Sequence, residues 1–213
     1  MMNSHVGAGW TQAPPHGPIG KARGIMSRVM DGCGSEGLNS FAVVAYLPEP
    51  LAGFVDALRQ ELVPACRLRA HITVLPPRPP ACEPELAWDE LRLAFQGVAP
   101  FPLELSEVGL FPVSQAIYIS IGSGRQELED LHTKLNHGRL KFSEPWTYHP
   151  HITLAQQLEP AEVNAALDLA RKRWREFTGP RRFTVDHLTF VQNTGENRWK
   201  DLADRELRPP VLA

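Results

Sequence analysis

Two tetrapeptides, HITV at residues 71–74 and HITL at residues 151–154, stand 80 residues apart and nearly repeat one another. Each follows an apolar strand-like run and a helix-like segment, and each is followed by a second helix and further extended chain. Self-similarity at so long a period indicates a duplicated structural unit. The sequence therefore predicts two similar lobes, each carrying one tetrapeptide at the corresponding place.

Hydrophobic periodicity and Gly/Pro punctuation give the elements of both units. In the first unit, we expect strands at 41–47 and 71–75, helices at 51–62 and from 85, and extended chain at 101–105 and 108–111. In the second, we expect strands at 116–121, 151–154, 183–191 and 198–207, and helices that begin after Ser123 and at Pro160. This order predicts an α+β fold of two pseudo-symmetric lobes, each an antiparallel sheet flanked by helices, around a central cleft.

The division of the chain follows from the same pattern. Residues 1–38 contain few aliphatic side chains and several Pro and Gly residues, so they are predicted to be a disordered tail. Residues 39–208 are expected to form a single domain, with lobe one at about 39–112 and lobe two at about 113–208. Each lobe is too small to form the expected site alone.

In a strand, successive side chains point to opposite faces, so the histidine and threonine of each tetrapeptide share one face. A single such motif is most often an ordinary, partly buried histidine. Two of them facing across a cleft can supply a general base and a general acid, because the ordinary histidine pKa lies near working pH. Threonine hydroxyls can donate to phosphate oxygens. His71 and His151 are thus the candidate acid–base pair, with Thr73 and Thr153 beside them.

The paired tetrapeptides resemble the signatures of the 2H phosphoesterase superfamily, above all its bacterial 2′-5′ RNA ligase-like and RNA 2′,3′-cyclic phosphodiesterase branch. The segments at 146–150 and 109–112 and the strand at 116–121 are similar to the same branch, so the resemblance covers about residues 39–208. It implies a bilobal α+β fold and hydrolysis of 2′,3′-cyclic phosphate or 2′-5′ bonds without a metal or other cofactor. It also implies that His151 is the base, that His71 is the acid, and that Thr73 and Thr153 bind the phosphate.

The segment PPRPP at residues 76–80 departs from the longer apolar and glycine continuation common in the cyclic phosphodiesterases. The substrate therefore stays open among RNA 3′ ends, 2′-5′ oligonucleotides and small cyclic nucleotides. Two alternatives remain: 2′-5′ RNA ligase activity, which is the reverse of 2′-5′ hydrolysis, and a non-catalytic module that binds RNA ends or nucleotides.

Other residues near the motifs have weaker assignments. Tyr148, Trp146 and Phe111 are candidates for stacking on a nucleobase, although aromatic residues beside a strand more often pack in the core. Arg78 could reach a phosphate, but a surface arginine among prolines is the simpler interpretation. His149 and His151 could bind zinc with His71, yet no carboxylate or cysteine lies nearby in the sequence and the threonines would have no role.

Composition removes several classes of protein. A net charge of −2 argues against a polycation that coats nucleic acid, so RNA ends or small nucleotides are the expected partners. Three cysteines without a CxxC pair argue against a disulfide scaffold and fit a reducing compartment. No apolar run of about 18 residues or signal-peptide core is present. We expect a cytoplasmic monomer with no membrane partner.

Overall fold

The computed structural model describes residues 40–195 and 198–209, so the predicted tail lies outside the described residues. Eight strands, four α-helices and one short 3₁₀ helix are found in this part of the chain. In chain order they are β1 (Phe41–Tyr46), α1 (Leu51–Leu62), β2 (His71–Arg78), α2 (Pro84–Ala94), β3 (Phe101–Leu110), β4 (Ile117–Ile121), α3 (Arg125–Leu135), η1 (Gly138–Leu140), β5 (His151–Ala155), α4 (Val163–Glu176), β6 (Arg182–Val185), β7 (His187–Asn193) and β8 (Trp199–Glu206).

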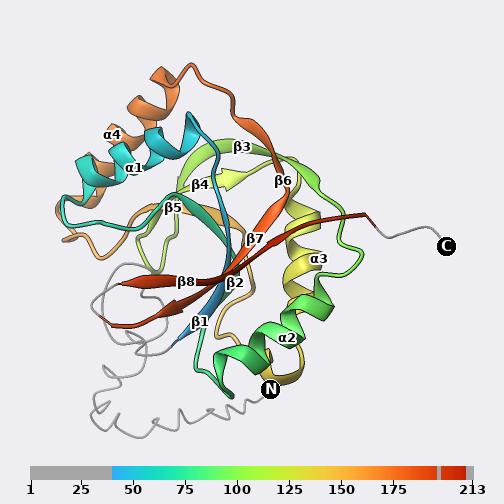
Figure 1. Cartoon of the computed structure of the whole chain (residues 1–213). Helices are drawn as coiled ribbons and strands as arrows, with labels where there is room; N and C mark the ends of the chain where they lie inside the picture. Colours follow the sequence, from blue (N-terminus) through green and yellow to red (C-terminus); the bar gives the residue numbers. More distant parts are fainter. Residues whose placement is uncertain (1–39, 196–197, 210–213) are drawn as a thin grey trace, which may run out of the picture.

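The strands form two four-stranded sheets in the order β2-β1-β7-β8 and β5-β4-β3-β6, with every strand pair antiparallel (Figure 1). The strand cores are rich in Val, Ile and Phe, which fit a pleated surface. The prediction of an α+β protein with two antiparallel sheets is confirmed.

The two sheets do not correspond to the two halves of the chain. β7 and β8, near the C-terminus, complete the sheet that contains β1 and β2, whereas β3 belongs to the sheet of the second unit. A division of lobes at residues 112 and 113 is therefore wrong for the strands. The single strand predicted at 183–191 is two strands in different sheets, joined through Asp186.

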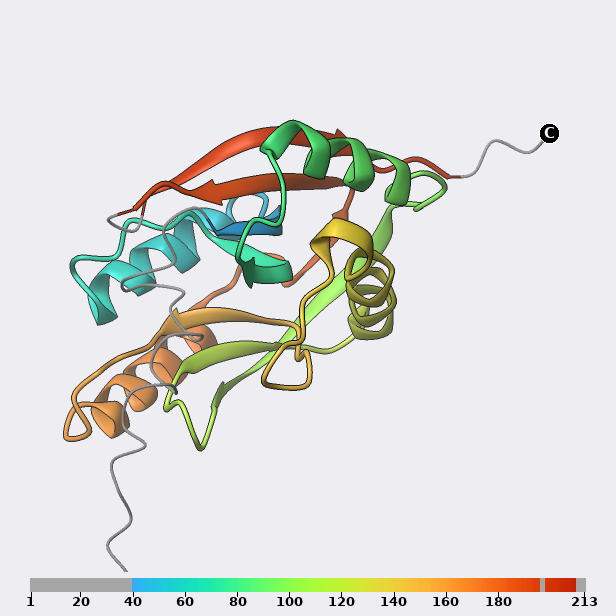
Figure 2. The same cartoon turned by 90° about the horizontal axis from the view of Figure 1, so that it is seen from below.

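The helices pack in two pairs and join the sheets. α1 and α4 lie side by side at one end of the molecule, and α2 and α3 form the other pair (Figures 1 and 2). α1 turns Leu51, Val55 and Leu58 inward, as its helical spacing predicts. It also contacts β5 of the other sheet, and α3 contacts β2. One continuous apolar core includes residues from both sheets.

Candidate active site

The two motif strands lie next to each other although they belong to different sheets. β2 and β5 are edge strands of their respective sheets, and the two strands are in contact. Along each of them the histidine and threonine are half-buried, whereas the aliphatic residues between and after them are buried. This is the alternation expected of a strand with one face in the core.

Both imidazoles are oriented by the same local hydrogen bond. Nδ1 of His71 lies 2.6 Å from the carbonyl oxygen of Arg69, and Nδ1 of His151 lies 2.6 Å from the carbonyl oxygen of His149. A carbonyl oxygen only accepts, so Nδ1 carries the proton in both rings. In the neutral form of each ring, Nε2 is then the unprotonated nitrogen that can accept a proton.

The surroundings keep both imidazoles neutral. Burial lowers the pKa of His71 to about 4, and the positive charge of Arg59 is the next cause. Burial also lowers the pKa of His151 to about 4, with His149 and Arg59 contributing. An uncharged imidazole near pH 7 can act as a base, and a bound anion would raise its pKa and allow it to hold a second proton.

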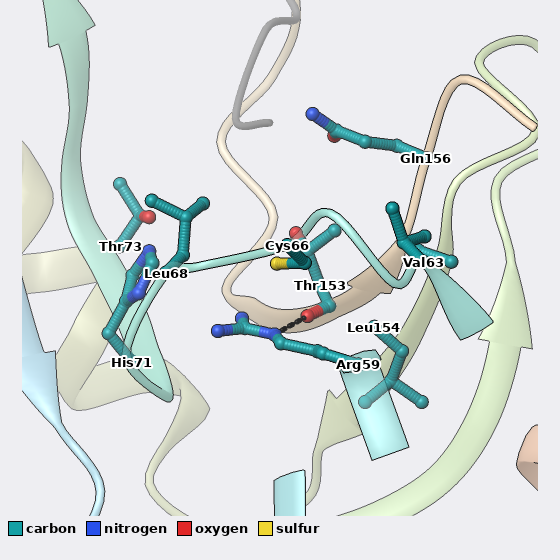
Figure 3. A pocket seen from close by; sticks show the side chains of 10 residues that line it. Arg59, Val63, Cys66, Leu68, His71, Thr73, Thr153, Leu154 and Gln156 are labelled. Atoms are coloured by element: carbon teal, nitrogen blue, oxygen red, sulfur yellow. Dashed lines mark hydrogen bonds between the residues drawn. The ribbon is translucent and has the colours of Figure 1, made fainter. Parts of the chain in front are cut away.

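A small cleft that is partly open to solvent begins at the motifs (Figure 3). His71, Thr73 and Thr153 line it together, so the structure brings three of the four predicted residues to one cavity. His151 is outside this lining. Its ring lies 5.0 Å from that of Phe111 and 5.6 Å from that of Tyr118, measured between centroids. Further along, the cleft is lined by Arg59, Val63, Cys66, Leu68, Leu154, Ala155 and Gln156.

Arg59 on α1 is a site residue that the sequence analysis missed. It is only 3% exposed, and it lines the cleft. Its Nε donates to the carbonyl oxygen of Thr153 at 2.7 Å (Figure 3), and its Nη1 donates to the carbonyl oxygen of Arg69 at 3.0 Å. The sequence contains a signal for this position. Arg59 lies four residues after Val55, so a charged side chain falls on the apolar face of the helix, where it is expected to be buried.

The three aromatic candidates have different surroundings. Phe111 stacks on Tyr118 at 4.1 Å and lies beside the second motif. Tyr148 donates its hydroxyl proton to the carbonyl oxygen of Thr73 at 2.9 Å and stacks on His132 at 4.1 Å. Trp146 is 45% exposed. Internal contacts thus occupy the hydroxyl and one ring face of Tyr148.

The expectation that Arg78 is a surface residue is wrong. At the end of β2, its side chain is only 1% exposed. Nη2 donates to Oε1 of Glu144 at 2.7 Å, and Nη1 donates to Asn136 Oδ1 at 2.8 Å and to the Leu140 carbonyl oxygen at 2.7 Å. His132 Nε2 lies 2.9 Å from the same Glu144 oxygen. Arg78 therefore holds the loop before the second motif against the first motif strand.

His149 does not join a metal cluster. Its Nδ1 lies 3.4 Å from Nη2 of Arg125, and its ring is 6.2 Å from that of His151. Across residues 40–195 and 198–209, no group of three or more His, Cys, Asp or Glu side chains could hold a metal ion. In the same ranges no helix is both long and apolar enough to cross a membrane.

Comparison with known proteins places the fold and the motifs in context. Residues 47–197 match the family described as the 2′-5′ RNA ligase superfamily. A protein of Halalkalibacterium halodurans, provisionally named a phosphoesterase, is 30% identical over 169 residues, which cover 75% of this chain and 92% of the relative. A similarly named protein of Oceanobacillus iheyensis is 38% identical over 80 residues, or 37% of this chain and 46% of that protein.

The fold itself resembles that of LigT from Escherichia coli. The crystal structure of apo LigT superposes with a TM-score of 0.56 at 17% identity, covering 80% of this chain and 98% of LigT. Because the family match spans most of the described residues and both H-x-T strands, the chain belongs to the 2′-5′ RNA ligase superfamily, the 2H phosphoesterases.

Proposed function

We propose that this phosphoesterase hydrolyses 2′,3′-cyclic phosphate or 2′-5′ bonds of RNA ends or small nucleotides by acid–base catalysis with His71 and His151. The observation that carries the proposal is the matched orientation of the two imidazoles, each with Nδ1 bound to the carbonyl oxygen two residues earlier. Two neutral, equivalently held rings on adjoining strands are suited to exchange protons with a substrate between them.

The reaction needs one proton acceptor and one proton donor. Unprotonated Nε2 of one histidine takes a proton from water as the water oxygen attacks phosphorus. The bond from phosphorus to the leaving ribose oxygen breaks, and that oxygen takes a proton from Nε2 of the other histidine. That histidine enters the reaction as an imidazolium, because the bound phosphodiester anion raises its pKa. The hydroxyls of Thr73 and Thr153 donate to the non-bridging oxygens, where negative charge increases. The product is a phosphomonoester with a free neighbouring hydroxyl.

The proposed substrate class has support beyond the motifs. LigT, which shares the fold, has been solved with 3′-AMP and with phosphate. A net charge of −2 suits a substrate held through one phosphate better than a long polyanion.

A panel assay tests the proposal. The full chain, treated with EDTA and exchanged into metal-free buffer, is incubated with nucleoside 2′,3′-cyclic phosphates, RNA ending in a cyclic phosphate and 2′-5′ dinucleotides. The expected result is turnover of at least one class without added metal, with a 2′- or 3′-phosphate product resolved by chromatography. Binding without turnover would support the non-catalytic module instead. Activity that EDTA abolishes and zinc restores would contradict the mechanism.

A further inference from the structure

The motif strands β2 and β5 are the outermost strands of their sheets in the part of the chain that the structure describes. Backbone groups along such an edge need hydrogen-bond partners from elsewhere in the molecule. On β5, the carbonyl oxygen of Thr153 accepts from Nε of Arg59 at 2.7 Å (Figure 3). On β2, the carbonyl oxygen of Thr73 accepts from the hydroxyl of Tyr148 at 2.9 Å. Each motif threonine is therefore bound, through its backbone, by a side chain from the other half of the chain.

Tyr148 reaches Thr73 from a network that is anchored on the same strand. Its ring stacks on that of His132, with centroids 4.1 Å apart and planes inclined by 3°. Nε2 of His132 lies 2.9 Å from Oε1 of Glu144, and the same oxygen accepts from Nη2 of Arg78 at 2.7 Å. Arg78 and Thr73 both belong to β2. The segment before β5 thus holds β2 at two points.

The surroundings keep the hydroxyl of Tyr148 protonated. Burial raises the pKa of Tyr148 far above its ordinary value, and the carboxylates of Glu144 and Glu129 raise it further. A carbonyl oxygen has no proton to give, so Tyr148 is the donor in its hydrogen bond with Thr73. Removal of this hydroxyl would leave the carbonyl oxygen of Thr73 without that donor, at a half-buried position where water replaces it poorly.

The backbone of Thr73 matters because its side chain belongs to the candidate site. Thr73 lines the cleft together with His71 and Thr153 (Figure 3). The rotamers open to a side chain depend on its own backbone angles, so a donor that fixes the carbonyl group also restricts where the hydroxyl points. A displacement of about 1 Å at a reacting group can cost about 10²-fold in rate. A hydroxyl that must meet a phosphate oxygen therefore needs a firmly held backbone.

We propose that Tyr148 is a positioning residue whose hydroxyl fixes the backbone of Thr73 and so orients the Thr73 hydroxyl toward the phosphate. The proposal rests on the proposed function, in which Thr73 donates to a non-bridging oxygen. It assigns Tyr148 a different role from the nucleobase stacking that the sequence suggests. His132 covers one face of the Tyr148 ring, and the hydroxyl is engaged inside the protein.

A double-mutant cycle tests whether Tyr148 acts through Thr73. Tyr148→Phe removes the hydroxyl and keeps the ring that stacks on His132. On a nucleoside 2′,3′-cyclic phosphate, we expect it to lower kcat by about tenfold and to change KM by less than about twofold. In the Thr73→Val background the same change should cost less than about twofold, whereas in the matched Thr153→Val background it should again cost about tenfold. Equal losses in the two backgrounds would overturn the proposal.

Substrates that differ only in the base separate positioning from nucleobase stacking. Tyr148→Phe keeps an aromatic ring, so a stacking residue would lose little in this variant. Only Tyr148→Leu would then raise KM, and it would do so more for adenosine than for uridine 2′,3′-cyclic phosphate. A positioning residue loses the same factor in kcat on both substrates, already in Tyr148→Phe. A base-dependent effect on KM that is confined to Tyr148→Leu would therefore assign Tyr148 to the nucleobase and refute the positioning role.

An NMR measurement tests the same role without turnover. Three-bond couplings across the Cα–Cβ bond report the rotamer of each threonine. We expect a single rotamer for Thr73 in the wild-type chain and rotamer averaging in Tyr148→Phe, with Thr153 unchanged in both. His132→Leu removes the stacked ring but keeps the hydroxyl, so it should produce the same change to a smaller extent and serves if Tyr148→Phe does not fold.

The two proposals fail in different ways. An unchanged rotamer of Thr73 in the folded variants would refute the positioning role, whatever the activity. Failure of the wild-type chain to hydrolyse any diester would contradict the proposed function instead, and the couplings would still show whether Tyr148 orients Thr73.

Discussion

The carbonyl oxygens of Arg69 and His149 determine which nitrogen of each imidazole is available for chemistry. Because each acceptor is a backbone group two residues earlier, in the segment that leads into the strand, the orientation needs no partner side chain. A substitution at residue 69 or 149 can therefore change the charge near the site while leaving the ring orientation in place.

Loss of either histidine should remove one proton transfer. On a 2′,3′-cyclic phosphate, His71→Ala and His151→Ala are each expected to reduce kcat by about 10²–10⁴, the range for a general acid or base. Steady-state kinetics measure this, with His187→Ala as the control, since His187 is exposed on β7 and binds Asp186. Near-normal kcat in either motif variant would rule out the two-histidine mechanism.

The threonine hydroxyls should matter less than the imidazoles. Thr73→Val and Thr153→Val keep the side-chain shape and remove one charge-assisted hydrogen bond, for an expected loss of about 10- to 100-fold in kcat/KM. Because charge on phosphate oxygens grows in the transition state, most of the loss should appear in kcat. A loss confined to KM would show that the hydroxyls bind ground-state substrate only.

At the scale of elements, β2 shows why a proline need not end a strand. The sequence predicts that the strand stops before Pro76, yet β2 continues through Pro76 and Pro77 to Arg78. Proline lacks the N–H needed in a sheet interior, but an edge strand leaves that side unpaired. Sequence periodicity identifies a strand but cannot show whether it lies at the edge of a sheet. The extension of β2 to Arg78, and with it the burial of Arg78, was therefore not predicted.

The loop before β5 should be stabilised through Glu144. Glu144→Gln leaves buried Arg78 without its carboxylate partner, so we expect unfolding free energy to fall by about 1–3 kcal/mol. Glu129→Gln is the matched control, because it breaks an exposed helical pair with Arg125 and should cost less than about 0.5 kcal/mol. Chemical denaturation measures both. Equal effects would show that Arg78 does not depend on the carboxylate.

For the whole molecule, the sequence predicts the two motifs, but it does not predict that strands from each half of the chain join the sheet of the other half. The period-two alternation around His71 and His151 is local, so it identifies the polar face directly. The placement of β3 and β7 depends on long-range pairing, on which a local pattern carries no information. The duplication correctly indicated two sheets, but it suggested that each would be built from consecutive chain.

Stability should decrease as the pH falls from about 6.5 to about 4. In the folded protein His71 and His151 each have a pKa of about 4, below the unfolded value of 6.5, so the unfolded chain binds more protons in this window. Denaturant unfolding measured across this range should show the unfolding free energy changing with pH at a slope that approaches about two protons. The slope should be smaller in the double variant His71→Gln/His151→Gln. A slope that persists in the double variant would assign the effect to other groups.

The core that the two sheets share has a consequence for how substrates are selected. β6 ends at Val185 in one sheet and β7 begins at His187 in the other, and both sheets share one core. Because the two sheets share one core, they cannot separate without exposing apolar side chains, so we expect the motif strands to keep their relative position when a substrate binds. Discrimination would then depend on steric fit at first encounter rather than on domain closure. Association rates for accepted nucleotides should accordingly approach those of rigid-body docking.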